Sequence, residues 1–486
     1  MDNNFIKDTK NLESKTKINK LKNLFSSITQ KKQGETIGLS NLEKRKISKL
    51  LNECLKDYGG EVAARERAAY IGQTYLELDM KGRKEILLML AGLEYDTSDI
   101  LKNISLLCKD LDGNNFKEEN IYKLKKSLRS PRSTILKQLN FLEPGIFLLV
   151  EMRKDLLKFI DDGAKELISL EEDFSNLLNS WFDVGFLDLE KITWDSSASL
   201  LQKVIMYEAV HKIQSWSDLE NRLDTDRRFY SLFHPRMKNE PLIFVEVALM
   251  NKIADSVQEI LDESLPTTNP EKANTAIFYS ISNTQSGLRG ISFGNFLIKK
   301  VVAELKNEFP NLKNFVTLSP MPRFVAWLKS QLKNDELEKL IKANIVFSKD
   351  SKSLLPENLN VDYLYKDLVE IINNPTTKLN SYNDSYRNKV LKPTLEMLCS
   401  IYLTNKDQSW ANDPVLKFHL TNGAEINRIN WMADTSENGM KQSLGLMVNY
   451  LYNLKSVEKN HENFGEDIKS ISSSVKDMMK KQTIKY

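Results

Sequence analysis

The sequence predicts an α+β protein in which an all-helical N-terminal domain precedes a domain that mixes strands with helices. Apolar residues recur at every third or fourth position from residue 39 to 182, as on one face of a helix. Runs of β-branched and aromatic residues, which are typical of strands, appear only after that point. A chain of 486 residues also exceeds what one hydrophobic core usually fills, so two or three domains are expected.

The first 38 residues are predicted to be a basic, partly ordered arm. Up to Gln33 there are eight lysines and three acidic residues. Such an arm can contact nucleic acid or anionic lipid, but a solvated tail has the same composition. The arm has neither the arginine enrichment of a transit peptide nor an apolar signal core. Because nothing elsewhere in the sequence is typical of base recognition, we expect no nucleic-acid partner.

Residues 39–182 are predicted to form a helical bundle that serves as a scaffold or oligomerisation domain. Its first helix has Ser40 as the expected N-cap. The later segments RKEILLMLAGL, SDILKNISLLCKDL and PGIFLLVEMRKDLLKFI continue the same periodicity. No residue spacing in this region is typical of a cofactor site.

Residues 183–486 are predicted to form the second domain, with a helical insertion at about 329–410. The strand candidates are RRFYSLF (227–233), PLIFVEVALM (241–250), TAIFYSIS (275–282), NFVTLS (314–319), VLKFHLTNGAEINRINWMAD (415–434) and LGLMVNYLYNL (444–454). The turn-rich link HPRMKNE between the first two suggests a hairpin. A helix is expected to include His211, and another to follow Ser456.

The segment GLRGISFGNFLIKKVVAEL (287–305) follows a strand candidate and runs into a helix. Glycines before a helix N-terminus can form a cradle for phosphate, because unpaired amides point outward there. An ordinary connection in an α/β domain has the same pattern. The segment is neither a dinucleotide fingerprint nor a Walker loop.

The four histidines, His211, His234, His419 and His461, show no metal-ligand spacing, and no metal site is expected. His419 lies in a polar cluster on a strand candidate and could donate a proton, although a structural histidine is the commoner outcome in such a sequence. Ser319 ends another strand candidate, without the elbow motif of a hydrolase nucleophile.

Hydrophobic residues make up 41% of the chain and charged residues 28%, which is typical of a globular protein in water. The longest apolar runs, such as IFLLV (146–150), are too short to span a bilayer, so no membrane partner is expected. The three scattered cysteines suggest a reducing compartment, and we expect a cytoplasmic enzyme.

Several long motifs in order resemble the malonyl-CoA decarboxylase family. They include SLRSPRSTILKQLNFLEPGIFLLVEMRKDLL, WFDVGFLDLEKITW, YEAVHKIQSWSDL, AIFYSIS…GLRGISFGNFLIKKVVAEL, LSPMPRFVAWL and FHLTNGAEINRINWMADTSENGMKQSLGLMVNY. The resemblance spans about residues 39–454. It implies a helical N-terminal domain followed by a GNAT-like (acetyltransferase-like) α/β catalytic domain.

The resemblance also implies a binding loop for the coenzyme A diphosphate. The residues implied are Arg289, Gly290, Ile291, Ser292, Phe293, Gly294 and Asn295. Arg289, Gly290 and Gly294 match the acetyltransferase loop, whereas Ser292 stands where that loop has its middle glycine. Animal members of the family carry glutamate there, so a role for that carboxylate does not transfer to Ser292.

The residues implied at the reacting end of the substrate are Ser319 and His419 as the catalytic pair, with Ser280, Tyr452 and His211 as further substrate-site positions. The expected reaction converts malonyl-CoA to acetyl-CoA and CO2 through an enolate of the thioester, without a metal or an organic cofactor. A homo-oligomer, dimer or tetramer, is the expected assembly. The alternatives are an acyl-CoA-dependent acyltransferase of the GNAT type and a CoA-thioester binding protein without activity.

Overall fold

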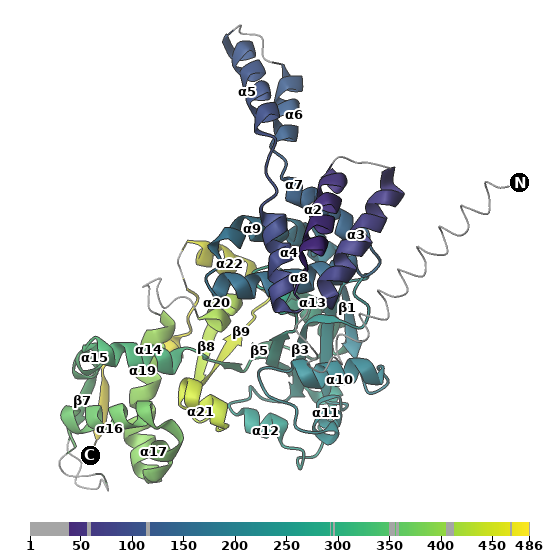
Figure 1. Ribbon diagram of the computed structural model, residues 1–486. Helices are drawn as coiled ribbons and strands as arrows, with labels where there is room; N and C mark the ends of the chain where they lie inside the picture. The colour runs from purple at the N-terminus through teal and green to yellow at the C-terminus, as the bar shows by residue number, and fades with distance from the viewer. Residues whose placement is uncertain are drawn as a thin grey trace, which may run out of the picture. The chain divides into compact units, whose positions relative to one another are not determined.

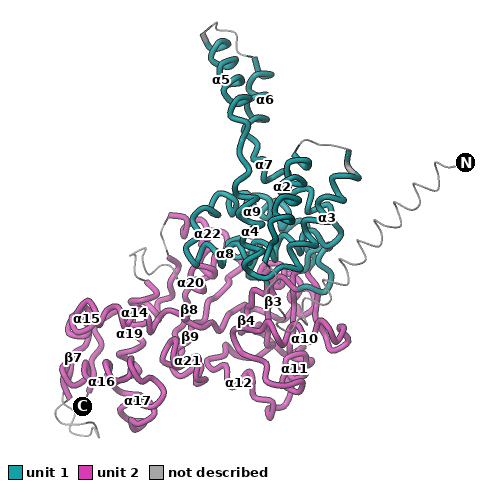
Figure 2. Tube along the Cα trace, viewed as in Figure 1, with its two compact units in different colours: residues 1–188, 233–240, 285–293 teal, residues 189–232, 241–284, 294–486 magenta. Residues whose placement is uncertain are grey.

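The structure, a computed structural model, describes residues 38–55, 60–112, 117–291, 293–294, 297–348, 355, 359–404, 413–466 and 469–485. All but the last residue of the predicted basic arm lies outside this part. Backbone contacts divide the chain into two units, which Figure 2 colours separately. Unit 1 comprises residues 1–188, 233–240 and 285–293, and unit 2 comprises residues 189–232, 241–284 and 294–486. The domain boundaries drawn from the sequence stay a prediction.

Unit 1 is helical, and among the described residues of 39–182 there is no strand. Its helices are α2 (Asn41–Leu55), α3 (Gly60–Glu77), α4 (Met80–Ala91), α5 (Thr97–Asp112), α6 (Glu118–Ser127), α7 (Pro131–Asn140), α8 (Gly145–Asp161) and α9 (Ile168–Trp181) (Figure 1). The Ser40 cap is confirmed: Glu43 N–H donates to Ser40 Oγ, and Ser40 N–H donates to the Glu43 carboxylate at 2.9 Å.

Helix α8 is the central element of unit 1 for the site described below. Ile146, Leu149 and Leu156 lie on one helical face and are almost completely buried. The 3₁₀ turn Ser286–Leu288, from much later in the chain, packs against this helix. At Gly287 the approach is so close that an added Cβ would lie 2.0 Å from Val150 O, which only glycine permits.

Unit 2 is built on a mixed sheet. Its strands within the described residues are β1 (Asp188–Ile192), β2 (Arg227–Phe233), β3 (Pro241–Met250), β4 (Thr275–Asn283), β5 (Asn314–Thr317), β6 (Ser319–Pro320), β8 (Glu425–Asn430) and β9 (Met447–Leu451). Their order is β1-β2-β3-β4-β5-β9-β6, with β8 on β9. The predicted bounds of β2 and β3 are confirmed, and so is their pairing.

The connection from β4 to β5 has the order that the sequence predicts. β4 runs into the glycine loop, α13 (Leu297–Glu308) follows, and β5 then lies parallel to β4. Strand β3 lies antiparallel to β4 on the other side. A helical region followed by this mixed sheet confirms the predicted fold class.

Further α-helices and strands of unit 2 lie outside this sheet. They are α10 (Ala198–Tyr207), α11 (Trp216–Arg222), α12 (Val257–Leu261), α14 (Phe324–Lys333), α15 (Glu336–Asn344), β7 (Ile345–Ser348), α16 (Val361–Asn373), α17 (Pro375–Ser381), α18 (Asp384–Tyr386), α19 (Lys392–Thr404), α20 (Pro414–Thr421), α21 (Glu437–Ser443), α22 (Val457–Gly465), α23 (Ser473–Met478) and β10 (Gln482–Lys485). The predicted insertion is indeed mostly helical, and Figure 1 shows α15, α16, α17 and β7 grouped together. It also holds β7, which the sequence analysis missed and which pairs with β10. No helix of the described chain is long and apolar enough to cross a membrane.

Candidate active site

Ser319 and His419 meet in unit 2 although 100 positions separate them in the chain. Ser319 begins the short strand β6, and His419 lies in the last turn of α20. Ser319 Oγ lies 2.9 Å from His419 Nε2, and both side chains are buried. A hydroxyl and an imidazole in direct contact, shielded from water, can exchange a proton with a bound group.

A chain of hydrogen bonds extends from this pair in both directions. Ser319 Oγ donates to Thr317 Oγ1 at 2.8 Å, and Thr317 Oγ1 also accepts the Tyr450 N–H at 3.1 Å. On the other side, His419 Nδ1 lies 2.8 Å from the Tyr452 hydroxyl. The Tyr450 ring stacks on the imidazole, with ring centroids 4.4 Å apart. The imidazole is therefore fixed by a contact at each nitrogen and by one on its face.

These contacts favour one tautomer of the imidazole. Because the Ser319 hydroxyl donates to Thr317, its oxygen is left to accept a hydrogen bond from His419 Nε2–H. Nδ1 is then bare and accepts from the Tyr452 hydroxyl, which stays protonated because burial raises its pKa well above the usual value. Burial also lowers the pKa of His419 to about 3, so the ring is neutral at physiological pH, with its proton on Nε2.

The prediction that His419 lies on a strand is wrong, because residues 414–421 form helix α20. Pro414 occupies the first turn, where a missing N–H costs nothing, and the Asp413 carboxylate accepts the Val415 and Leu416 N–H groups. The helix-starting pair Asp413-Pro414 therefore decides the local structure, and the apolar residues that follow, which suggested a strand, lie in a helix. The helix places His419 next to Tyr450 of strand β9 and next to Tyr452, which follows the end of that strand.

The glycine loop after β4 has the backbone that its glycines predict. Gly290 has φ +83°, in the left-handed region that favours glycine. Gly294, in unit 2, lies close to Phe418, the residue that precedes His419: an added Cβ would lie 3.5 Å from the Phe418 ring. That ring in turn lies edge-on to the His419 imidazole, with centroids 5.2 Å apart. The end of the loop and the imidazole thus share a neighbour.

The side chains of the loop divide into two kinds. Ile291 and Phe293 are buried, so their side chains are not available to a ligand, and the Ile291 N–H already donates to Leu288 O at 2.9 Å. Arg289 is exposed, and its guanidinium makes an ion pair with Asp161 at 2.9 Å. Ser292 and Asn295, which the sequence analysis assigned to the same loop, lie outside the described residues.

Ser280 lies on the other face of the sheet from Ser319. In the β3–β4 register, Val247 pairs with Phe278 and Glu246 with Ser280, so Tyr279 is the extra residue of a β-bulge. Since Glu246 and Val247 alternate, Ser280 faces away from Phe278 and from Thr317, its partner on β5. There it donates to both oxygens of Glu208, at 2.8 and 2.9 Å.

The prediction that His211 lies on a helix is also wrong, because α10 ends at Tyr207. Glu208 leaves the helical conformation, and its carboxylate accepts the N–H groups of Val210 and His211 at 2.9 and 2.7 Å. The same carboxylate accepts Ser282 Oγ–H at 2.9 Å. Ser280 and His211 therefore gather around Glu208 and not around the Ser319–His419 pair.

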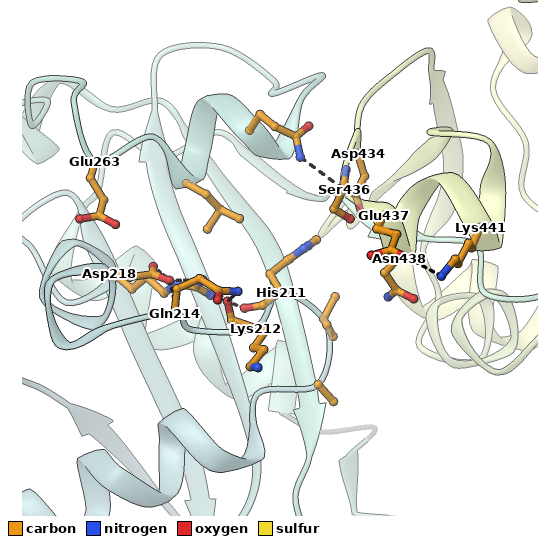
Figure 3. Close-up of a pocket in the computed structure, with 15 residues that line it drawn as sticks. His211, Lys212, Gln214, Asp218, Glu263, Asp434, Ser436, Glu437, Asn438 and Lys441 are labelled. Carbon is orange, nitrogen blue, oxygen red and sulfur yellow. Dashed lines mark hydrogen bonds and ion pairs between the residues drawn. The ribbon is translucent and has the colours of Figure 1, made fainter. Parts of the chain in front are cut away.

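His211, Lys212, Asp434 and Ser436 line a cavity of about 690 Å³. Figure 3 shows how these side chains lie. His211 Nε2 has no hydrogen-bond partner within the described part of the chain. Burial lowers the pKa of His211, and the nearby Asp434 carboxylate opposes that shift. Burial raises the pKa of the Glu246 carboxyl to about 8, and the nearby Glu208 carboxylate adds to that shift.

Two family models match the chain where the two kinds of structure lie. Residues 185–486 match the malonyl-CoA decarboxylase C-terminal domain, and residues 95–182 match the malonyl-CoA decarboxylase N-terminal domain. The chain belongs to the malonyl-CoA decarboxylase family. This confirms the resemblance stated from the motifs.

Relatives and solved structures agree with the assignment to this family. The mitochondrial malonyl-CoA decarboxylase of Anser anser anser is 40% identical over 341 residues, which cover 68% of this chain and 66% of the goose protein. The rat protein is 37% identical, with 66% and 65% covered. The malonyl-CoA decarboxylase structures from Rhodopseudomonas palustris and Agrobacterium vitis are 36% and 35% identical, with TM-scores of 0.75 and 0.76; each match covers 89% of this chain and 99% of the other.

Sequence reasoning missed several residues that shape this family member's site. Thr317 and Tyr450 lie in recognised strands, but their spacing gives no sign that they contact Ser319 and His419. Glu246 offered a signal, because it is a lone acid within the apolar strand PLIFVEVALM. Arg153 offered another, because it interrupts the apolar face of α8 formed by Leu149 and Leu156.

Proposed function

We propose that this chain decarboxylates malonyl-CoA, giving acetyl-CoA and CO2. The observation that carries the proposal is the buried 2.9 Å contact between Ser319 Oγ and His419 Nε2, in a chain of the malonyl-CoA decarboxylase family. The goose and rat proteins that carry that name align with this chain over 66% and 65% of their lengths.

In this proposal the coenzyme is held at its diphosphate by the loop from Arg289 to Gly294. The Gly290 amide and the Arg289 guanidinium are proposed to supply donors and positive charge to the diphosphate. Within unit 2, Gly294 lies close to Phe418, whose ring is a neighbour of the His419 imidazole. Ser280 and His211 are proposed to contact the substrate from the far face of the sheet, where β4 and β5 part beyond the Phe278–Thr317 pair.

The bond that breaks is the one between the malonyl carboxylate and C2. Its electron pair moves into the thioester and forms an enolate, while the carboxylate leaves as neutral CO2. A pocket that excludes water disfavours the charged carboxylate relative to CO2. Ser319 can bind the departing carboxylate or pass on a proton, and hydrogen-bond donors near the thioester oxygen would stabilise the developing charge there.

The enolate carbon then takes a proton, for which His419 is the proposed donor. A neutral imidazole N–H is a weak acid, but a thioester enolate is a stronger base, and neutral histidines act as electrophiles in other enzymes. As Nε2 gives up its proton, Nδ1 can accept the Tyr452 hydroxyl proton, and the negative charge of the enolate then lies on the Tyr452 oxygen. Because burial raises the pKa of Tyr452, this oxygen takes up a proton from solvent, which restores the hydroxyl and balances the reaction. No metal or organic cofactor is proposed, because the thioester itself accepts the electron pair.

The test is to incubate the purified protein with malonyl-CoA alone and to follow the acyl-CoA species by mass spectrometry. We expect malonyl-CoA to be replaced by acetyl-CoA with release of CO2. In D2O the acetyl group should carry one deuterium, which reports protonation of C2. Turnover that starts only after an acyl acceptor is added would instead indicate an acyltransferase, and unchanged malonyl-CoA would indicate a binding protein.

The proposal also includes a homo-oligomer, dimer or tetramer, in the cytoplasm. Exposed apolar side chains on α5 and α6, among them Leu101, Leu111 and Tyr122, support assembly through the helical unit. The animal relatives are named mitochondrial, so the compartment needs its own measurement. Light scattering gives the oligomer size, and cell fractionation gives the location.

A further inference from the structure

Arg153 of α8 is buried in unit 1, and its guanidinium donates hydrogen bonds to two backbone carbonyls of the glycine loop. Its Nη1 donates to Gly287 O at 2.7 Å and to Arg289 O at 2.9 Å. Its other donors bind Glu171 Oε1 of α9, with the shortest distance 2.6 Å. Only 2% of Arg153 is exposed, so the guanidinium is not available as a direct ligand for a molecule in solution.

The grip of Arg153 on these carbonyls fixes the direction of a loop amide. In a trans peptide unit the C=O and the following N–H point in opposite directions. The Arg289 carbonyl points at Arg153, so the Gly290 N–H points away from α8. Gly290, which follows this peptide unit, has a positive φ, so the chain turns at that residue. We propose that Arg153 is a positioning residue that aims the Gly290 amide at the diphosphate of the coenzyme.

Glu171 offsets the free-energy cost of burying the Arg153 guanidinium and neutralises its positive charge. A buried guanidinium without a partner would strongly destabilise the fold, whereas the Arg153–Glu171 ion pair carries no net charge. Arg153 therefore acts through the geometry of the carbonyls it holds. This inference rests on the proposed function in one respect only, namely that the loop binds the coenzyme diphosphate.

Unit 1 contains a matched control for a purely structural effect. Arg132 of α7 is also buried and makes an ion pair with Asp173 of α9, at 2.6 Å. Its remaining bonds go to Ser130, Ser169 and Ala91 O, none of which belongs to the loop. A general loss of packing should therefore appear equally in Arg132→Lys and Arg153→Lys.

The experiment compares two substrates and one ligand in the full chain. Malonyl-CoA carries the diphosphate, and malonyl-pantetheine lacks it. For Arg153→Lys we expect KM for malonyl-CoA and Kd for CoA to rise about tenfold, the loss that one hydrogen bond to a charged group gives. For malonyl-pantetheine we expect kcat/KM to stay within about twofold of the wild-type value, because that substrate does not use the loop. Arg132→Lys should leave all three quantities near wild type.

Two outcomes would overturn the inference: an equal loss on both substrates in Arg153→Lys, or the same rise in Kd for CoA in Arg132→Lys. Wild-type protein that releases no CO2 would refute the proposed function instead. Calorimetry with CoA then still decides the inference, because the rise in Kd requires no turnover. Should Arg153→Lys fail to fold, Glu171→Gln loosens the guanidinium and should produce the same split between the substrates.

Discussion

His419 Nε2 lies 2.9 Å from Ser319 Oγ, while its Nδ1 lies 2.8 Å from the Tyr452 hydroxyl. The ring is thus held in one orientation before any substrate arrives, and proton transfer requires no search for the correct rotamer.

Replacing the imidazole should remove the proposed proton donor. For His419→Asn we expect kcat for malonyl-CoA to fall at least about a hundredfold, the usual contribution of a general acid. Stopped assays of acetyl-CoA formation measure it. Kd for CoA and the circular dichroism spectrum should stay close to wild type; near-normal turnover in a folded variant would exclude His419 as the acid.

Removing the Tyr452 hydroxyl should weaken catalysis through the tautomer of His419. In Tyr452→Phe the Nδ1 nitrogen loses its donor, so the Nε2–H form is no longer favoured. We expect kcat to fall about tenfold, which corresponds to about 1.4 kcal/mol. Tyr450→Phe, which keeps the ring stacked on the imidazole, is the control; an equal loss in both variants would contradict this role of the Tyr452 hydroxyl.

The low pKa of His419 predicts a specific acid sensitivity of the fold. The imidazole pKa is 6.5 when exposed and about 3 in the folded protein. Between these values the unfolded chain binds a proton that the folded chain does not, so stability falls as pH decreases from 6.5 and this loss is complete below about 3. Between pH 6.5 and 5 His419 should account for about 2 kcal/mol.

Urea denaturation of wild type and His419→Asn at the two pH values measures this difference. His211 and His234, whose pKa values burial also lowers, contribute equally to both proteins and cancel. Identical pH dependence in the two proteins would mean that His419 charges as freely in the fold as in solution.

The ion pair of Arg289 with Asp161 should compete with the coenzyme for the guanidinium. Both side chains are more than half exposed, so the pair is weak and easily exchanged. For Asp161→Asn we expect KM for malonyl-CoA to fall about twofold, and more at low salt. Asp162→Asn, one residue along, should leave KM unchanged. A rise in KM for Asp161→Asn would argue against a diphosphate contact by Arg289.

The sequence predicted the strand, loop and helix around Gly290 because each has a local signal: β-branched residues, glycines and an apolar stripe. The contact of Ser319 with His419 had no such signal, and only the resemblance of long motifs indicated it. The helix that carries His419 was missed, although Asp413 and Pro414 mark its start. Glu208 and Arg153 were missed because their importance depends on strand register and packing between distant segments.

The position of residues 285–293 in unit 1 has a consequence for how this protein could be divided. A cut at residue 183 would leave that segment, together with 233–240, in a fragment that lacks Arg153, Val150 and the other side chains of α8. The helical half is therefore no detachable module that gene fusion or a truncated expression clone could discard. Residues 285–293 belong to the helical unit but lie in the sequence between two stretches of the sheet unit, so a gene that encodes one unit must also encode part of the other.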